Sequence, residues 1–176
     1  YLYMDGDLVV KNQKTKEQQI IKSTFEPSAH EVFSVGDIYN GRLYGSSMKP
    51  GNIFTYDTNT GKTNNLGSLT RGTIQAYAIM AYKDRLFTTS YTGGYVDVFT
   101  VDANGLPINR KPVAHLHQMA KQERLLQLRL AYDGYIYSPT VPIKGFLGGT
   151  LVQIDPESLK AKVFKDIVYN QSFMSV

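Results

Sequence analysis

Asn52-Ile53-Phe54-Thr55-Tyr56-Asp57 is a short apolar strand that ends in an acidic residue and opens a turn, and the chain repeats this pattern. Equivalent strands end at Asn12, Asp102 and Asp155, so that successive closing residues are 45, 45 and 53 residues apart. A period in this range, carrying strands and turns, is typical of repeat architectures built from small antiparallel sheets. The stretch therefore predicts one structural unit that recurs along the chain.

A second landmark recurs in front of each of these strands. It is a tight polar turn preceded by a tyrosine and followed by another apolar strand, and it occurs at Tyr39-Asn40-Gly41, Tyr82-Lys83-Asp84 and Tyr132-Asp133-Gly134. Asn-Gly and Asp-Gly favour two-residue hairpins because they accept positive φ angles. Each unit thus contains four antiparallel strands, which predicts an all-β fold of β-propeller blades. The shared register of the three tyrosines indicates a structural packing role.

The repeat also predicts how the chain is divided. Residues 30–68, 73–114 and 125–168 form three whole blades, and residues 1–24 with 170–176 form the two parts of a split blade. A short helical insert is expected within residues 114–128, where apolar residues recur with helical spacing. Either the last strand completes a four-bladed ring, or the chain is an excerpt of a larger propeller, which the initial Tyr1 favours. Unpaired blade edges favour association, so a homodimer is a candidate assembly.

Composition excludes several classes of protein. The 176 residues contain no cysteine, which excludes disulfides, thiolate nucleophiles and cysteine metal sites. No apolar run approaches the length of a membrane-spanning helix. The net charge of +4 is mild, and the lysines near Lys14 are too sparse for a nucleic-acid surface, which also interleaves aromatic residues. We therefore expect no nucleic acid and no membrane span.

The units resemble bacterial propellers of the WD40-like, YVTN and SMP-30 type. Asn40-Gly41-Arg42-Leu43-Tyr44, followed by a glycine-containing loop and the strand that ends at Asp57, carries the resemblance most fully. The Gly-His and Trp-Asp marks of true WD40 repeats are missing, and the chain has no tryptophan. The resemblance implies a secreted or cell-envelope location, with the cytoplasm as the alternative. It does not define a function, because this fold hosts binding modules, lyases, lactonases and scaffolds.

Loop lengths indicate which face of the propeller is the functional one. In a four-stranded meander the connections between the second and third strands, and between successive units, lie on one face, and here these are the long and variable ones. Aromatic and cationic residues on these loops and on the inner strands suit a carbohydrate, a peptide, an anionic group or a protein partner. The predicted ligand-binding residues are Lys49, Arg71, Gln75, Tyr91, Tyr95, Gln127, Arg129 and Phe146. Arg129 could equally be half of a structural ion pair.

Two other functions stay open beside this non-catalytic binding module. A propeller-type lyase acting on an acidic sugar or ester would use His30, His115, Arg129 and Tyr77, with Arg129 holding the anion and a histidine taking the proton. A structural module would instead assemble through open blade edges. His115-Leu116-His117 could hold a metal only with a third ligand that is not evident, and no phosphate loop or hydrolase elbow occurs. We therefore predict no metal and no cofactor.

Overall fold

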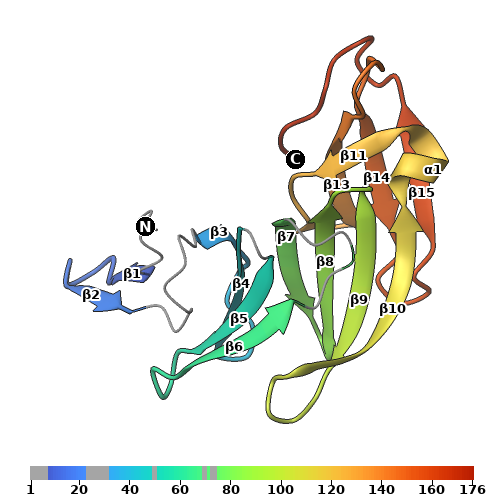
Figure 1. Cartoon of the computed structure of the whole chain (residues 1–176). Coiled ribbons are helices and arrows are strands. Elements are labelled where there is room, and N and C mark those ends of the chain that lie inside the picture. Colours follow the sequence, from blue (N-terminus) through green and yellow to red (C-terminus); the bar gives the residue numbers. More distant parts are fainter. Residues whose placement is uncertain (1–7, 23–31, 49–50, 69–70, 72–74) are drawn as a thin grey trace.

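The computed structural model describes residues 8–22, 32–48, 51–68, 71 and 75–176. Within this part of the chain, neighbouring strands pair antiparallel in four sheets, which confirms the predicted all-β propeller fold. The second, third and fourth sheets follow one another in chain order, each packed beside the next (Figure 1). Among the described residues, no helix has the length and apolar character needed to cross a membrane.

The first two sheets belong to the N-terminal part of the chain. The first sheet has two strands, β1 (Leu8–Lys11) and β2 (Gln18–Ile21). The second sheet has four strands in the order β3 (Val32–Val35), β4 (Arg42–Ser47), β5 (Asn52–Asp57) and β6 (Thr63–Ser68). The strand that ends at Asp57 is therefore β5, the third strand of its sheet, as the repeat predicts.

The third sheet shows the meander most completely. Its strands are β7 (Gln75–Tyr82), β8 (Arg85–Tyr91), β9 (Tyr95–Val101) and β10 (Pro107–His115), in that order. Helix α1 (Leu116–Ala120) follows directly, inside the range where a short helical insert was expected. Lys121 ends the helix in the left-handed conformation with φ 57°, so the chain turns at once into the next sheet.

The fourth sheet is built from β11 (Gln122–Leu125), β12 (Arg129–Leu130), β13 (Ile136–Pro142), β14 (Thr150–Ile154) and β15 (Ala161–Lys165). Strands β11 and β12 both pair with β13. Between these two pairings, residues 126–128 lie opposite only residues 138 and 139 of β13. The four-strand repeat predicts one inner strand over residues 125–132, and the structure interrupts it at residues 126–128. Pro139 lies opposite this interruption and has no N–H to donate to a neighbouring strand, while its carbonyl accepts from Leu126 at 3.3 Å.

The core lies between the sheets. One apolar cluster joins the third and fourth sheets around Phe87, Leu116 and Ile136, which are fully buried. A second cluster joins the second and third sheets around Ile53 and Leu86. Hydrogen bonds reinforce this second contact, because the hydroxyls of Ser34 and Ser46 both donate to the carbonyl of Ala76 at 2.8 Å. Inner strands of neighbouring sheets are thus held at fixed spacing.

Tyr132 and the last residues of the chain differ from what the repeat predicts. Tyr132 is 113% exposed, so the packing role expected for the repeated tyrosines is wrong at this position. Residues 171–176 form no strand, and Phe173 donates its N–H to the carbonyl of Thr140 in β13 at 3.2 Å. The division of the chain into three whole blades and one split blade stays a proposal.

Candidate ligand-binding cleft

Short turns and long connections lie at opposite ends of the strands. The hairpins that follow Asp57, Asp102 and Asp155 lie at one end, which we call the short-turn face, and in each of them the Asp carboxylate accepts backbone N–H bonds. The connections that contain residues 92–94, helix α1 and residues 143–149 emerge at the other end, the long-loop face. A cleft of about 530 Å³ opens on the long-loop face. It is lined by Thr92, Gly93, Tyr95, His115, His117, Gln118, Lys121 and Glu123.

A stack of three side chains forms one wall of this cleft. The rings of Tyr95 and His115 stack with centroids 4.4 Å apart, and the Arg71 guanidinium lies 4.2 Å from the centre of the Tyr95 ring. Tyr95 and His115 both line the cleft, whereas Arg71 is not among its lining residues. Arg71 therefore supports the stack through its contact with the Tyr95 ring.

Arg71 is held from behind by a buried carboxylate. Its Nε donates to Oδ2 of Asp97 at 3.1 Å, and its Nη2 lies 2.9 Å from Oδ1. Asp97 is 1% exposed, whereas 31% of the Arg71 side chain is exposed. A buried carboxylate needs such a partner, because an unpaired charge away from water is costly. Arg71 thus orients the stack, and its charge is not free for a ligand.

A second aromatic group crosses three sheets beside the cleft. The ring of Tyr77 meets Phe33 at 5.1 Å and Tyr91 at 5.9 Å, both edge to face, and Arg124 lies 5.1 Å from the centre of the Tyr91 ring. Burial raises the pKa of Tyr77, and hydrogen bonding to Tyr91 raises the pKa of Arg124. Tyr77 therefore stays a neutral phenol and Arg124 a cation at neutral pH. Tyr91 and Arg124 each adjoin, in sequence, a residue that lines the cleft.

A smaller hollow of about 230 Å³ lies between the inner strands. Tyr77, Gln127 and Arg129 line it together with Asp37. Arg129 pairs with Asp37 at 3.2 Å, so it forms an ion pair between the fourth and second sheets, the structural alternative considered for it. Gln127 accepts the backbone N–H of Val176 at 3.2 Å. Both predicted residues therefore have protein partners.

The remaining predicted residues are scattered. Gln75 contacts Met48 through its side-chain amide, in a bridge between the second and third sheets. Phe146 is 50% exposed in the loop of residues 143–149 and lines neither the cleft nor the smaller hollow. Lys49 and His30 lie outside the described residues. Of the predicted binding residues that the structure describes, Tyr95 alone lines the long-loop cleft, where it is joined by His115 of the lyase alternative.

The structure separates His115 from Arg129, whereas Tyr77 lines the same hollow as Arg129. His115 ends β10 at the long-loop face, whereas Arg129 precedes the turn at residues 131–135 on the short-turn face. The two side chains line different cavities. In the described part of the chain, no group of three or more His, Asp or Glu side chains is arranged to hold a metal ion.

Sequence reasoning missed several residues of the site. Phe33 and Arg124 complete the aromatic group, and Gln118, Lys121 and Glu123 form the far wall of the cleft. Their common signal is position: four of them occupy the helical insert and the strand after it. A connection that is longer than its counterparts in other repeats is where added contacts are expected.

Comparisons with known proteins identify the fold. No family model matches the sequence, and no curated protein matches it. Among solved structures, luciferin-regenerating enzyme has a TM-score of 0.66 at 13% identity, over 85% of this chain and 51% of the other. A nidogen/laminin complex matches with a TM-score of 0.63 at 10% identity, over 94% of this chain and 60% of the other. The extracellular domain of the putative one-component system BT4673 of B. thetaiotaomicron matches with a TM-score of 0.61 at 16% identity, over 96% of this chain and 21% of the other.

These similarities define the chain as a β-propeller protein, in agreement with the resemblance seen in its repeats. At 10 to 16% identity they show the fold alone. The chain spans less than two thirds of each matched chain. The matched proteins include an enzyme and a protein captured with a partner, so the fold is compatible with either kind of activity.

Proposed function

We propose that this chain is a non-catalytic β-propeller module that binds a carbohydrate or peptide carrying an acidic group in the cleft on its long-loop face. The observation that carries the proposal is the cleft itself. Its volume of about 530 Å³ is within the range of pockets for small ligands and short segments. It lies on the face where the long connections emerge.

The lining of the cleft supports an acidic ligand. Lys121, His115 and His117 line the cleft with N–H groups, and Glu123 is the one carboxylate in the described lining. The ring of His115, backed by Tyr95 and Arg71, offers a flat surface against which a sugar or a planar peptide group can pack. Because the stack is fixed by the buried Asp97, the ligand would meet a preorganised surface and would order little protein on binding.

The setting is proposed on weaker similarity. An exported or cell-envelope location accords with the extracellular domain among the matched structures. Nidogen, another match, is described in complex with laminin, which accords with a protein partner for this fold. A lyase in which His115 takes the proton is not favoured, since His115 and the anion-holding Arg129 line different cavities.

The test is a titration of the labelled protein followed by nuclear magnetic resonance. Digalacturonic acid and a triglutamate peptide serve as acidic probes, and galactobiose serves as the neutral comparison. We expect an acidic probe to shift the signals of His115, Gln118 and Lys121. His115→Ala should weaken binding about tenfold, because it removes both the ring surface and an N–H donor.

Two variants sharpen the result. His115→Phe keeps the stack but not the N–H, so it should bind more tightly than the alanine variant and less tightly than the parent. Tyr132→Ala removes a fully exposed ring on the short-turn face and should leave binding unchanged. Equal binding by the parent and His115→Ala, or the appearance of an unsaturated product, would refute the proposal.

A further inference from the structure

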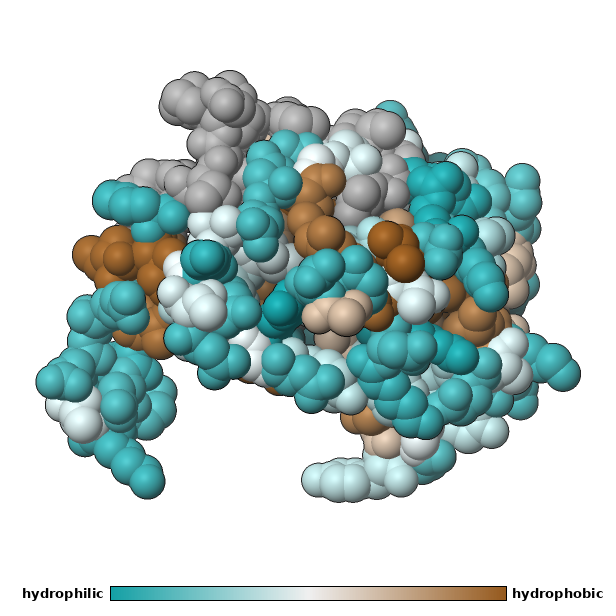
Figure 2. All heavy atoms as spheres, turned by 90° about the horizontal axis from the view of Figure 1, so that it is seen from below, coloured by the Kyte–Doolittle hydropathy of each residue, from teal (hydrophilic) through white to brown (hydrophobic). Residues whose placement is uncertain are grey.

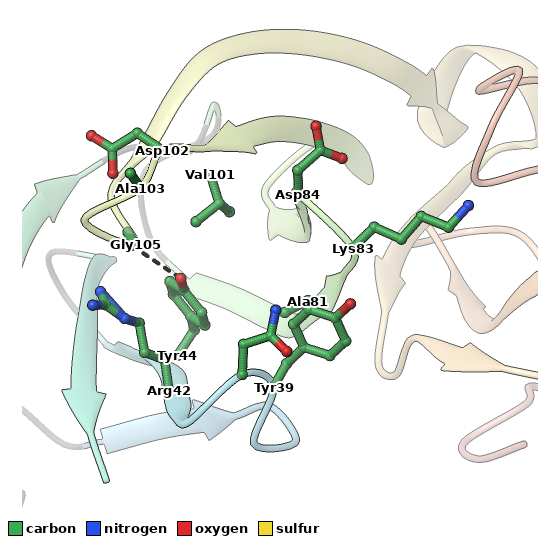
Figure 3. A pocket seen from close by; sticks show the side chains of 11 residues that line it. Tyr39, Arg42, Tyr44, Ala81, Lys83, Asp84, Val101, Asp102, Ala103 and Gly105 are labelled. Atoms are coloured by element: carbon green, nitrogen blue, oxygen red, sulfur yellow. Dashed lines mark hydrogen bonds between the residues drawn. The ribbon is translucent and has the colours of Figure 1, made fainter. Parts of the chain in front are cut away.

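The short-turn face carries a hollow of about 430 Å³ where the second and third sheets meet (Figure 3). One wall is the turn between β3 and β4, with Tyr39 and Asn40, and the other is formed by turns of the third sheet, with Asp84 and Asp102. Figure 2 views the molecule from this side, where hydrophilic residues cover most of the surface between small apolar areas. Nothing proposed above uses this hollow.

The cations at this hollow are already engaged. Arg42 pairs with Asp57 at 3.6 Å and donates to the carbonyl of Asn104. Lys83 pairs with Glu157 of the fourth sheet, and its side chain points away from the hollow in Figure 3. Neither charge is therefore presented to a ligand, and an anion would find no free cation here.

The floor of the hollow is largely apolar and is rigid. Tyr44 is buried, and its hydroxyl donates to the carbonyl of Gly105 at 3.0 Å, which joins the two sheets (Figure 3). Burial raises the pKa of Tyr44, so the hydroxyl keeps its proton. Ala81 and Val101 complete this floor. A ligand with an apolar surface can therefore pack against it without displacing protein contacts.

Three hydrogen-bonding side chains surround the floor without side-chain partners among the described residues. They are the hydroxyl of Tyr39, the amide of Asn40 and the carboxylate of Asp84. Their backbones are fixed: Tyr39 and Arg42 exchange hydrogen bonds of 2.8 and 3.0 Å across the turn, and Asp84 accepts the N–H of Val101 at 2.6 Å. Accessible polar groups on a fixed backbone suit a ligand that brings several donors and acceptors of its own.

We infer that this hollow is a binding site for a neutral pyranose sugar. An amine would use the acceptors alone, whereas neighbouring sugar hydroxyls can donate to Asp84 while they exchange bonds with Asn40 and Tyr39. The C–H face of a pyranose matches the apolar floor, and 430 Å³ holds one or two sugar units. The site lies on the face opposite the cleft proposed above, and its occupation does not depend on that cleft.

The experiment is a titration of the full chain with methyl glucoside, methyl galactoside and methyl mannoside, followed by nuclear magnetic resonance. We expect at least one of them to shift the side-chain amide of Asn40 and the backbone amide of Gly105. Asp84→Asn, an exposed and isosteric change, should weaken binding about tenfold through loss of a charge-assisted bond. Ala81→Leu should abolish binding by filling the floor.

Matched controls keep the result interpretable. Glu17→Gln removes a carboxylate from the turn between β1 and β2, away from the hollow, and should leave affinity unchanged. Should Ala81→Leu lose its folded spectrum, Asp84→Asn decides alone. Sugar-induced shifts confined to His115 and Gln118 would overturn this site while leaving the long-loop cleft proposal standing. The absence of any shift with all three glycosides would overturn it as well.

Discussion

Arg71 and Asp97 are unequal partners, because the arginine keeps access to water and the carboxylate does not. Asp97 is 1% exposed on β9, and the Arg71 side chain is 31% exposed. Loss of either partner breaks the same two contacts, but only one of the two losses leaves a charge stranded in the protein. The pair therefore offers a direct measure of what a buried charge costs in this fold.

We predict that Arg71→Ala destabilises the protein more than Asp97→Asn. The first change leaves a buried carboxylate without a counter-charge and should cost about 3 kcal/mol, whereas the second frees an arginine that can turn to solvent and should cost about 1 kcal/mol. Urea unfolding followed by circular dichroism measures both values. Equal costs would contradict the prediction, because they would mean that the Asp97 carboxylate is not left as an uncompensated buried charge when Arg71 is removed.

Gly36 lies close to the backbone of the neighbouring sheet. A Cβ atom at this position would lie 2.4 Å from the carbonyl oxygen of Ile79, on the inner strand of the next sheet. We predict that Gly36→Ala destabilises the protein by about 2 kcal/mol, because the second and third sheets must move apart. Gly61→Asn provides the control, since that turn has open space and a left-handed φ that asparagine tolerates. The same unfolding assay distinguishes the two.

At the scale of elements, side chains at the turns of one sheet form ion pairs and hydrogen bonds with a turn of the next sheet. Lys83, in the turn after β7, and Arg85, the first residue of β8, reach Glu157 and the carbonyl of Pro156 in the turn after β14. Arg42 reaches Asn104 in the same way one sheet earlier. The hydrogen bond from Lys83 lowers the pKa of Glu157, and the same bond raises the pKa of Lys83.

These pKa shifts predict the pH range over which the Lys83–Glu157 ion pair stabilises the fold. Because the folded-state pKa of Glu157 is lowered, its contribution is complete above the pKa of a free glutamate and is lost as the pH falls through the lowered value. Because the pKa of Lys83 is raised, its contribution is complete below that of a free lysine and is lost as the pH rises through the raised value. Melting temperatures of Glu157→Gln should therefore differ from those of the parent at neutral pH and converge with them in strong acid. A constant difference down to strong acid would contradict this.

How far the elements could be predicted depends on their local signals. Asn40 and Gly41 both adopt the positive φ values that this dipeptide favours, whereas in the turn at Asp133-Gly134 only Gly134 does. The strand that ends at Asp57 is where the repeat places it. The inner strand of the fourth sheet was mispredicted as continuous, although Pro139 on its partner gave a warning. Arg124 and Glu123 could not be assigned to a site, because their meeting with Tyr91 and the cleft depends on how two sheets pack.

At the scale of the whole molecule, backbone amides should be most protected from hydrogen exchange where the strands are buried in the core. The two larger clusters join the second, third and fourth sheets, while β2 is mostly exposed. We predict that hydrogen exchange is slowest in β8, which is buried along most of its length, and fastest in β1 and β2. Exchange followed by mass spectrometry of peptides gives the order. Strong protection of β2 would mean that an additional contact covers the first sheet.

The hollow on the short-turn face has one wall from each of two neighbouring sheets, and this gives its occupant a mechanical role. A sugar bonded to Asn40 on one side and to Asp84 on the other would act as a cross-link. In a single-molecule pulling experiment, saturating glycoside should raise the force at which the second sheet peels from the third. Because the site needs residues from both sheets, its affinity for a sugar should fall when the contact between the second and third sheets is lost.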